Sequence, residues 1–443
     1  MGDEKEEKFK KRIELIAILQ HPEGGWNAED YADAGARGCF DEFCSSDIQK
    51  KERETQQTDP EKYDKRKEGI FAETSGRGHG AVLDMSEFGY SMDNLTRAST
   101  LFLCAPQYAA HLQQSLRRAT AERGFKKIEI EGANELMANM FELYNEMQAS
   151  ENPKIPAEDA RFVLPLNTKT TIQTKLDARE LMHLYSMAQR MNVPQDVKDT
   201  VEQMYKLASN IAPHMMQDRR KNLEVLAWMP APQLFAKENV PIKRLSITSP
   251  EYFEGAKLLD ASGKGFMSED EIKRAVMSRD EALLANMKHY HFTFLAAMSL
   301  AAFHQATRQR TWDQSVEPLI DAVERGEYVI PPKIKDTPFQ RKYEELNNQA
   351  LSLVLNNWDN PEVYGVIPHS LKVYDLIHVN GWNAVHSIGK RTCTEAQWEI
   401  RKVAQNMANA IREYDEDLGR FAKPQGITYG VCPEKKGCHK CDL

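Results

Sequence analysis

Residues 380–401 combine side-chain types that suit the binding of an anion. They read NGWNAVHSIGKRTCTEAQWEIR, an aromatic- and amide-rich stretch that leads into a Lys-Arg pair. Thr394 and Gln397 have the spacing of a capping box, which predicts a helix beginning at Thr394. Arg391 would then lie just ahead of a helix N-terminus, where a cation and unsatisfied backbone N–H groups together favour a phosphate. The alternative is a surface salt bridge from Arg391 to a glutamate of the same segment.

A second polar cluster, Gln305–Thr311, reads QATRQRT and follows the apolar run FTFLAAMSLAAF. The run predicts a buried helix whose polar end brings Gln305, Arg308 and Arg310 together. A buried helix that ends in such a cluster suggests a polar cavity. The alternative, which the residues alone favour, is a charged helix terminus paired with acids such as Asp313.

The cysteines raise the question of a metal. Seven cysteines are too few for a disulfide framework in a chain of 443 residues, and three of them lie in the last twelve residues. Cys438 and Cys441 have the Cys-x-x-Cys spacing of half a zinc site. Cys432 adds a third ligand, and Cys393, in the loop before AQWEIR, is a candidate fourth. Structural zinc and free thiols are the two alternatives for this tail.

The elements that would position these residues are mostly helices. Apolar residues recur every three or four positions over 196–216 and over 394–418, which predicts two long helices. Shorter β-like runs at 162–166, 175–176 and 373–379 predict interspersed strands. The fold class predicted from this mixture is α+β.

Three weak internal sequence repeats, here called echoes, occur in the same order and indicate a duplicated domain. KRIELIAILQHPE near residue 12 resembles IKRLSITSPEY near residue 242. Gln114–Thr120 resembles Gln305–Thr311, at an offset of 305 − 114 = 191. Val163–Pro165 resembles Val366–Pro368, at an offset of 366 − 163 = 203.

The echoes predict two homologous halves, residues 1–235 and 236–443, joined near 230–242. The stretch 45–69 is more than half charged and has no apolar face, and we expect it to be a solvated insertion. Only the first half has such a stretch, which would account for the larger offset of the first echo.

The overall composition excludes some classes of protein. A net charge of −8 argues against a protein that coats nucleic acid. No run of about 18 uncharged apolar residues is present, so a membrane span is not expected. The first residues, MGDEKEEKFKKRIELIAIL, are too short in apolar sequence for a secretory signal, so we expect a cytoplasmic enzyme.

Several of these motifs together resemble the flavin-dependent thymidylate synthases, in the tandem form of that family. AQWEIR, preceded by Asn380 and Arg391, is similar to the family's C-terminal signature. The residues at 160–184, with ARFVLPLN and DARELMHL, resemble its central strand and helix. The Gln305 cluster resembles its Arg-His-Arg motif, with Gln309 where histidine is usual, and GRGHGAV with His79 resembles its Gly-His motif. The resemblance implies two α+β domains, helix-rich, each with a central antiparallel sheet.

The resemblance further implies reductive C5-methylation of deoxyuridylate. FAD would be the cofactor, and methylenetetrahydrofolate and NADPH the co-substrates, with no cysteine nucleophile needed. The implied catalytic residues are Arg391, Gln305 and Arg308. The implied nucleotide-binding residues are Arg161, Arg391, Gln305 and Arg310. The implied flavin-binding residues are Arg308, Asn380, Arg179, His183, His386 and His79.

The two halves depart from the family pattern in different places. The first half has Ala188 where the nucleotide arginine belongs, and the second has Tyr364 and Trp382 in place of the counterparts of Arg161 and Arg179. These complementary losses suggest that the fused pair keeps half of the sites. Two chains would form a pseudo-tetramer that binds a pyrimidine nucleotide but neither membrane nor nucleic acid. The alternatives are C5-hydroxymethylation or another alkylation of a pyrimidine nucleotide, and a non-catalytic homologue that binds nucleotide or flavin.

Overall fold

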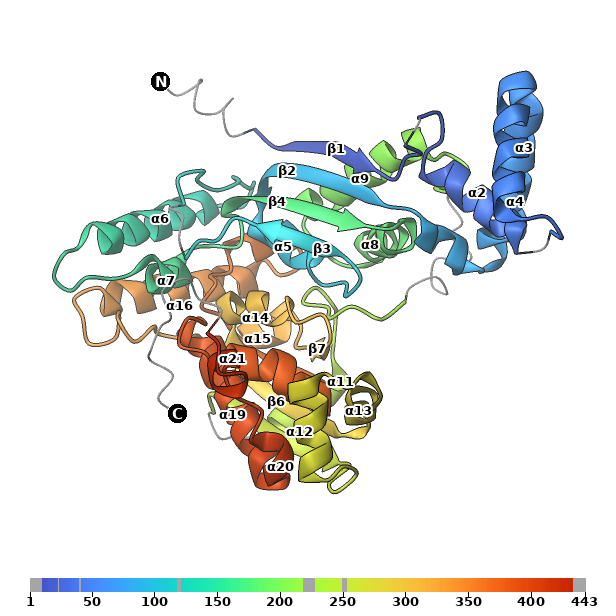
Figure 1. Ribbon diagram of the computed structural model, residues 1–443. Coiled ribbons are helices and arrows are strands. Elements are labelled where there is room, and N and C mark those ends of the chain that lie inside the picture. The colour runs from blue at the N-terminus through green and yellow to red at the C-terminus, as the bar shows by residue number, and fades with distance from the viewer. Residues whose placement is uncertain are drawn as a thin grey trace. The chain divides into compact units, whose positions relative to one another are not determined.

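The computed structural model describes residues 10–22, 24–39, 41–117, 121–217, 228–248 and 253–432 (Figure 1). The chain divides into two compact units. Unit 1 comprises residues 1–128 and 167–230, and unit 2 comprises residues 129–166 and 231–443. Residues 129–166, which chain order places in the first half, therefore pack in unit 2. No helix among the described residues is long and apolar enough to span a membrane.

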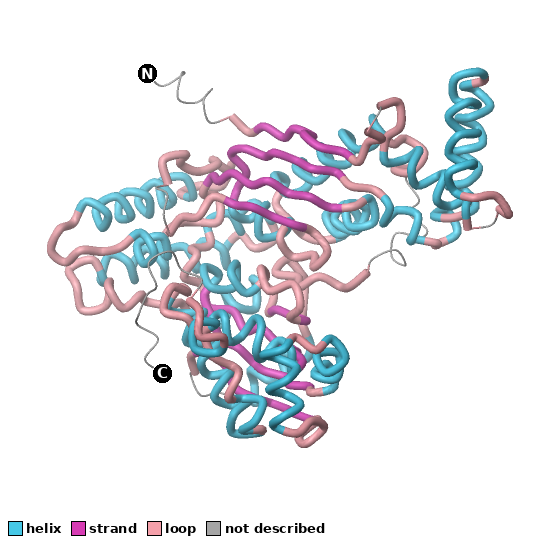
Figure 2. The backbone as a smooth tube through the Cα atoms, in the orientation of Figure 1, coloured by secondary structure: helices cyan, strands magenta, loops and turns pink. Residues whose placement is uncertain are grey.

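Unit 1 is built on a four-stranded antiparallel sheet, drawn in magenta in Figure 2. In spatial order its strands are β1 (Arg12–Ile18), β2 (Phe88–Thr96), β4 (Lys169–Leu176) and β3 (Ala110–Gln113). Its helices are α2 (Ala28–Gly38), α3 (Ser45–Thr58), α4 (Pro60–Glu73), η1 (Ser75–Arg77), η2 (Gly80–Met85), α5 (Arg97–Leu103), α8 (Ala178–Arg190) and α9 (Gln195–Ile211). The apolar stripe of α9 packs on β1 and β2, as the predicted periodicity requires.

The charged stretch 45–69 is not a featureless solvated segment. It forms α3 and most of α4, two helices that pack on each other and on α2. Tyr63 and Lys67 are buried, and Lys67 Nζ lies 2.9 Å from Asp30 Oδ1 and 3.0 Å from Glu29 Oε1. The stretch is therefore a pair of packed helices with buried ion pairs and not a wholly solvated segment.

Unit 2 repeats the sheet, with strands in the spatial order β5 (Gly255–Ser262), β6 (His291–Ser299), β8 (Lys372–Asn380) and β7 (Asp313–Val316). In chain order, the first helices of unit 2 are α6 (Ala133–Ala149), α7 (Ala157–Ala160), η3 (Arg161–Val163), α11 (Val240–Thr248), α12 (Glu269–Ser278), α13 (Glu281–Asn286), η4 (Met287–His289) and α14 (Leu300–Ala306). The rest are α15 (Leu319–Arg325), α16 (Gln340–Asn356), η5 (Pro361–Val366), α17 (Gly381–Asn383), η6 (Ala384–Ile388), α18 (Gly389–Arg391), α19 (Trp398–Tyr414), α20 (Glu416–Gly419) and α21 (Gln425–Thr428).

Several predictions of local structure need correction in unit 2. The apolar run 292–303 is not one helix: most of it is strand β6, and α14 begins only at Leu300. β6 is buried on both faces, so its sequence has no alternation that would mark it as a strand. Residues 162–166 form the end of η3 and a short extended piece rather than a strand, whereas 373–379 lies within β8 as predicted.

The two units have equivalent elements in the same order, which fits the predicted duplication. The first residues of β2 and β6, of α5 and α14, and of β3 and β7 each differ by 203. The same offset relates α9 to α19 (398 − 195 = 203). The third echo, at 203, therefore joins equivalent positions. The second, at 191, does not, and the first compares strand β1 with helix α11, so both are wrong.

Within unit 2, the first-half segment 129–166 meets its second-half counterpart. Helix α6 packs on α16, and the prolines of the third echo form an isolated antiparallel bridge. Leu166 N donates to Ile367 O at 2.8 Å, and His369 N donates to Leu164 O at 3.0 Å. These two bonds exchange under the 203-residue offset, because Leu166 corresponds to His369 and Leu164 to Ile367. A local two-fold axis therefore relates the two copies of this segment.

Candidate active site

Arg391 and the Gln305–Thr311 cluster meet in unit 2. The side-chain oxygen of Gln309 accepts hydrogen bonds from Nε and Nη2 of Arg391, at 2.7 and 2.6 Å, in the amide orientation that satisfies both groups. Two bonds to one acceptor fix the direction of the guanidinium as well as its position. Gln309 thus joins the segment for which the sequence suggested an anionic ligand to the cluster for which it suggested a polar cavity.

Further hydrogen bonds tie the same two segments together. Asn383 Nδ2 donates to Thr311 Oγ1 at 2.7 Å, and the buried Trp312 Nε1 donates to Ser387 Oγ at 2.7 Å. Ser387 Oγ donates in turn to Asn383 O at 3.0 Å, inside the π-helical turn η6. Such turns are frequent at functional sites. The turn that follows α14 is therefore fixed against the start of the segment that carries Arg391.

Gln305 lies in the last turn of α14, and Arg308 and Arg310 follow it directly. Arg308 N donates to Gln305 O at 3.3 Å. Nε2 of Gln305 is buried and has no hydrogen-bond partner among the residues that the structure describes. Leaving a buried amide N–H unpaired costs about 1–3 kcal/mol, so this group suits a polar ligand that completes its bonding.

The predicted helix start at Thr394 is wrong. Helix α19 begins at Trp398, and Gln397 is its N-cap, accepting from Glu399 N at 3.1 Å and Ile400 N at 2.9 Å. Arg391 instead ends the short helix α18. Arg391 is therefore not adjacent to the N-terminus of α19, and the bonds to Gln309 direct its guanidinium.

Glu399 is a functional-site neighbour that the sequence patterns did not single out. It is buried, and its carboxylate accepts from Ser299 N at 2.7 Å and Ser299 Oγ at 2.5 Å. Burial raises the pKa of Glu399 to about 7, although the bonds from Ser299 oppose this. Its position four residues before Val403, on the apolar stripe of α19, was the available signal.

Arg161 lies in unit 2 although it comes from the first half of the chain. It is buried, Nε donates to Glu158 O at 3.2 Å, and its charge lowers the pKa of Glu399. The neighbouring Phe162 stacks on Trp398, with ring centroids 5.8 Å apart. The structure thus brings the first-half arginine to the start of the second-half signature helix.

Asn380 and His386 occupy the segment between β8 and Arg391. Asn380 is the N-cap of α17 and exchanges hydrogen bonds with Asn383. His386 stacks on Trp382 with ring centroids 5.2 Å apart, and burial together with the charge of Lys390 lowers its pKa. The imidazole is therefore neutral at neutral pH.

The remaining predicted flavin residues lie in unit 1. Arg179 Nε lies 2.8 Å from Asp84 Oδ1, and its guanidinium lies 4.0 Å from the centroid of Trp228. Gly80, next to His79, approaches so closely that an added Cβ would lie 2.4 Å from Arg179 Nη2. The Gly-His motif therefore packs directly on Arg179.

His183 occupies the next turn of α8. Its Nδ1 lies 3.8 Å from Glu180 Oε1, and the two residues are both buried. Neither this nitrogen nor either Glu180 carboxylate oxygen has a hydrogen-bond partner within the described part of the chain. These buried atoms suit a polar ligand in unit 1.

The first half lacks the arginine cluster altogether. Moving back by 203 from Gln305, Arg308 and Arg310 gives Phe102, Ala105 and Gln107. The same offset from Arg391 gives Ala188 in α8. Asn380 and His386 correspond to Asp177 and His183, so both halves keep the histidine, whereas the cluster and its partner arginine occur only in the second half.

Two of the four proposed zinc ligands can be examined. Neither Cys393 nor Cys432 forms a disulfide with a described residue, and Cys432 packs against Gly426 in α21. Cys438 and Cys441 lie outside the described residues. No group of three or more potential ligands suited to a metal occurs within the described ranges.

A sequence profile described as "Thymidylate synthase complementing protein" matches this chain in two segments, residues 25–214 and 244–415. The chain belongs to that family. Its two matches agree with the repeated sheets and with the 203-residue correspondence.

Curated relatives are flavin-dependent thymidylate synthases. That of Geobacter sulfurreducens is 30% identical over 152 residues, which is 32% of this chain and 64% of the relative, so the chain spans just under two thirds of it. That of Pyrococcus furiosus is 29% identical over 173 residues, covering 35% of this chain and 71% of the relative.

Solved structures give weaker similarities. Thymidylate synthase X from Helicobacter pylori, solved with FAD and dUMP, is 14% identical with a TM-score of 0.38, covering 48% of this chain and all of that one (100%). A UMP/dUMP methylase from Streptomyces cacaoi, solved with 5-Br dUMP, is 14% identical with a TM-score of 0.34, covering 49% and 97%. The family assignment rests on the two-segment match.

Proposed function

We propose that this protein catalyses FAD-dependent reductive C5-methylation of deoxyuridylate, with methylenetetrahydrofolate and NADPH as co-substrates. The observation that carries the proposal is the Gln309–Arg391 pair, which joins the two signature motifs of the second half into one polar cluster. Membership of the thymidylate synthase complementing family and the named activities of the curated relatives support it.

The residues present fit a nucleotide and a flavin. Arg391 is directed by Gln309 and would bind the nucleotide phosphate, with Arg161 and Arg310 as further phosphate ligands. Gln305 offers a buried amide N–H that a pyrimidine carbonyl would satisfy. A bound FAD supplies the electron-transfer and one-carbon chemistry that these side chains do not. Arg308, Asn380 and His386, together with His79, Arg179 and His183 of unit 1, are the proposed flavin-binding residues.

The protein's own contribution is orientation and charge. Arg391 and Gln305 would fix the phosphate and the base at two points, which positions C5 without a covalent bond to the protein. The neutral His386, stacked on Trp382, adds an aromatic surface without adding a charge.

We further propose that each chain keeps one active site rather than two. The first half has Phe102 and Ala105 where the second has Gln305 and Arg308. Arg161, in contrast, has no counterpart arginine in the second half, and it packs within unit 2 beside Trp398 and Glu399. One complete set of residues therefore requires both halves. Two chains would assemble the pseudo-tetramer that the tandem arrangement implies.

The decisive experiment is tritium release from C5-labelled deoxyuridylate by the full chain with FAD, methylenetetrahydrofolate and NADPH. We expect release together with thymidylate, and loss of both in Arg391→Gln. Flavin absorbance without release would contradict the thymidylate proposal. Release with a hydroxymethylated product would favour the related C5-hydroxymethylation. A protein that resists flavin loading would point to a non-catalytic homologue.

We also propose that Cys393, Cys432, Cys438 and Cys441 bind a structural zinc ion. The chemistry of the donor set supports this, since thiolates in a Cys-x-x-Cys pair are preferred zinc ligands. Metal analysis of the purified chain should give one zinc per chain, lost in Cys441→Ser. Four thiols that react readily with a thiol reagent in the absence of denaturant, with no metal present, would contradict the proposal.

A further inference from the structure

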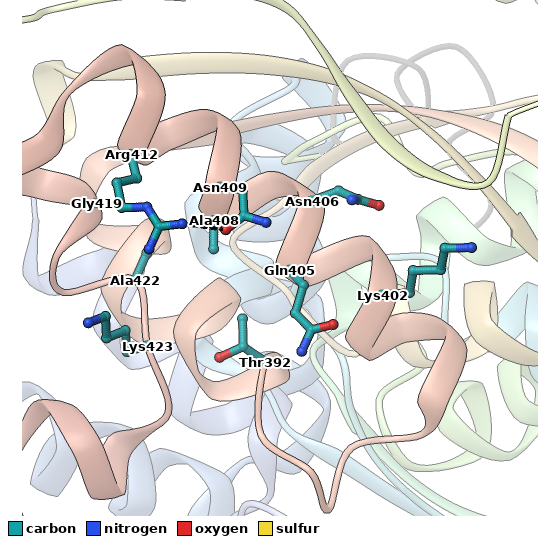
Figure 3. Close-up of a pocket in the computed structure, with 10 residues that line it drawn as sticks. All are labelled: Thr392, Lys402, Gln405, Asn406, Ala408, Asn409, Arg412, Gly419, Ala422 and Lys423. Atoms are coloured by element: carbon teal, nitrogen blue, oxygen red, sulfur yellow. Dashed lines mark hydrogen bonds between the residues drawn. The ribbon is translucent and has the colours of Figure 1, made fainter. Parts of the chain in front are cut away.

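A second polar cavity, of about 300 Å³, lies in unit 2 along α19 (Figure 3). We call it the α19 pocket. One wall is the helix face that carries Lys402, Gln405, Asn409 and Arg412, which recur at helical spacing opposite the buried stripe of the same helix. The other wall is the segment from Gly419 to Lys423, and Thr392 closes one end. None of the proposed active-site residues lines this pocket.

The lining of the α19 pocket is positively charged. It contains three cations and three side-chain amides, and no acidic residue occurs among the described residues that line it. Lys402 pairs with Glu254 and points away from the centre in Figure 3. The Arg412 guanidinium is turned toward the Lys423 segment, and Gln405 carries its amide toward Thr392. The Arg412 guanidinium and the Gln405 amide are donors of the kind that bind the oxygens of an anion.

The helix wall carries amides between two cations, Lys402 and Arg412, and this mixture favours a phosphate over a simple counter-ion. Arg412 Nη2 donates to Asn409 Oδ1 at 3.0 Å, which holds the guanidinium against the helix face. A guanidinium presents a rigid fork of donors that matches a phosphate, and lysine adds a point charge. The volume lies at the lower end of the roughly 300–1,000 Å³ typical of ligand pockets, which suits a small phosphate-bearing molecule and not a flavin.

The α19 pocket also borders the short helix that ends in Arg391. Thr392, which lines the pocket, follows Arg391, and its Oγ1 donates to Gly389 O at 2.7 Å. The backbone of Lys423 packs on Gly389 so closely that an added Cβ would lie 2.6 Å from Lys423 O. The pocket therefore contacts α18 through Thr392 and Lys423 and not through Arg391.

We propose that the α19 pocket binds a small phosphate-bearing molecule, at a site separate from the one at Arg391. Arg412 and Lys423 bind the phosphate oxygens, and the amides of Gln405 and Asn409 donate further hydrogen bonds. The proposal concerns binding and does not depend on the methylation activity.

The test is titration calorimetry of the full chain with inorganic tripolyphosphate and, separately, with thymidine triphosphate. We expect Arg412→Gln combined with Lys423→Gln to weaken binding by about tenfold or more, since two charge-assisted contacts are removed. Arg341→Gln is the control, because it removes an exposed charge of unit 2 at a residue that does not line the pocket. The affinity of this variant for both ligands should stay within about twofold of that of the parent chain. Unfolding midpoints of all variants verify that they are folded.

The variant Arg391→Gln separates this site from the proposed active site. Binding that persists in Arg391→Gln and falls in the double variant supports the α19 pocket. Binding that falls in Arg391→Gln and persists in the double variant overturns the proposal, as does a parent chain that binds neither ligand at millimolar concentration. Tighter binding of the nucleotide than of tripolyphosphate would identify a nucleotide ligand, and equal binding would identify the phosphate group alone as the recognised element.

Discussion

Gln309 accepts two hydrogen bonds from the guanidinium of Arg391, at 2.7 and 2.6 Å. Because the amide is neutral, it directs the arginine without cancelling its charge. A carboxylate at the same place would make the same two bonds but would leave the pair neutral. Glutamine therefore directs the guanidinium of Arg391 and adds no negative charge beside it.

This relationship predicts that both the shape and the charge of residue 309 matter for nucleotide binding. Gln309→Leu removes the acceptor oxygen and should weaken deoxyuridylate binding by about tenfold, since Arg391 loses its orientation. Gln309→Glu keeps an acceptor for Arg391 but neutralises the charge of the pair, and should weaken binding by at least as much. Calorimetric titration with deoxyuridylate measures both effects.

The control for Gln309 is Gln340→Leu, where the amide bonds locally to Glu344 at 2.9 Å, on α16. Its affinity should equal that of the parent chain. If Gln309→Glu bound the nucleotide as tightly as the parent chain, the charge argument for Arg391 would fail.

The buried carboxyl of Glu399 predicts a pH-dependent stability. Burial raises its pKa from 4.5 to about 7, so the folded chain binds the proton more tightly than the unfolded chain. The stability this contributes is present below pH 4.5 and is lost as the pH rises through 7. Glutamine resembles the protonated carboxyl: its oxygen can accept from Ser299 N, and its amide nitrogen can donate to Ser299 Oγ. The stability of Glu399→Gln therefore lacks this pH dependence, and from pH 4 to 9 its free energy of unfolding should rise by about 3 kcal/mol relative to that of the parent chain.

The equivalent residue of the first half provides a control of opposite sign. Asp196 is also buried, which raises its pKa, but Lys11 at 2.9 Å and the bond from Ser99 outweigh this and lower it overall. Its contribution is present above pH 3.8 and is lost as the pH falls through the lowered value. Asp196→Asn should therefore cost stability at pH 7 and progressively less below pH 4. Equal pH profiles in denaturant melts of the two variants would contradict both assignments.

The sequence correctly predicted helices and strands that bury only one face, because their apolar residues recur at a regular spacing. The stripe of Val197, Val201 and Met204 marks α9 because only one face of that helix is buried. β6 was missed because both of its faces are buried, so nothing alternates. The N-cap at Gln397 was misplaced because Thr394 satisfies the same capping pattern without occupying the position.

The site itself was predictable in its residue types and not in its pairing. The arginines and amides of 305–310 and 380–391 stand out as polar groups beside apolar runs. That Gln309 meets Arg391 depends on how the turn after α14 packs on η6, which involves Trp312 and Ser387. The echo at Gln114 was wrong for a similar reason. Gln114–Thr120 shares residue types with Gln305–Thr311, whereas the structurally equivalent segment, Phe102–Tyr108, does not.

The close packing of Gly80 on Arg179 predicts that a larger residue at position 80 would displace the arginine. Gly80→Ala would place a methyl group 2.4 Å from Arg179 Nη2, so the arginine must move away from Asp84 and Trp228. We expect a loss of about 1–3 kcal/mol in the free energy of unfolding and a lower flavin content after purification. Gly69→Ala is the control, because no atom lies near its added Cβ. This variant should lower neither the free energy of unfolding nor the flavin content. Normal flavin content in Gly80→Ala would argue against a flavin contact by Arg179.

The division of residues between the halves predicts one flavin and one nucleotide bound per chain. Arg161 packs within unit 2, whereas its counterpart, Tyr364, packs against Phe235 and has no cationic group to offer. Arg161→Gln should therefore weaken deoxyuridylate binding by about tenfold, while Tyr364→Phe should leave it unchanged. Absorbance of the loaded protein gives the flavin stoichiometry, and equilibrium dialysis gives that of the nucleotide. Two equivalents of either ligand per chain would show that the first half retains a site, which its Phe102 and Ala105 give no means of building.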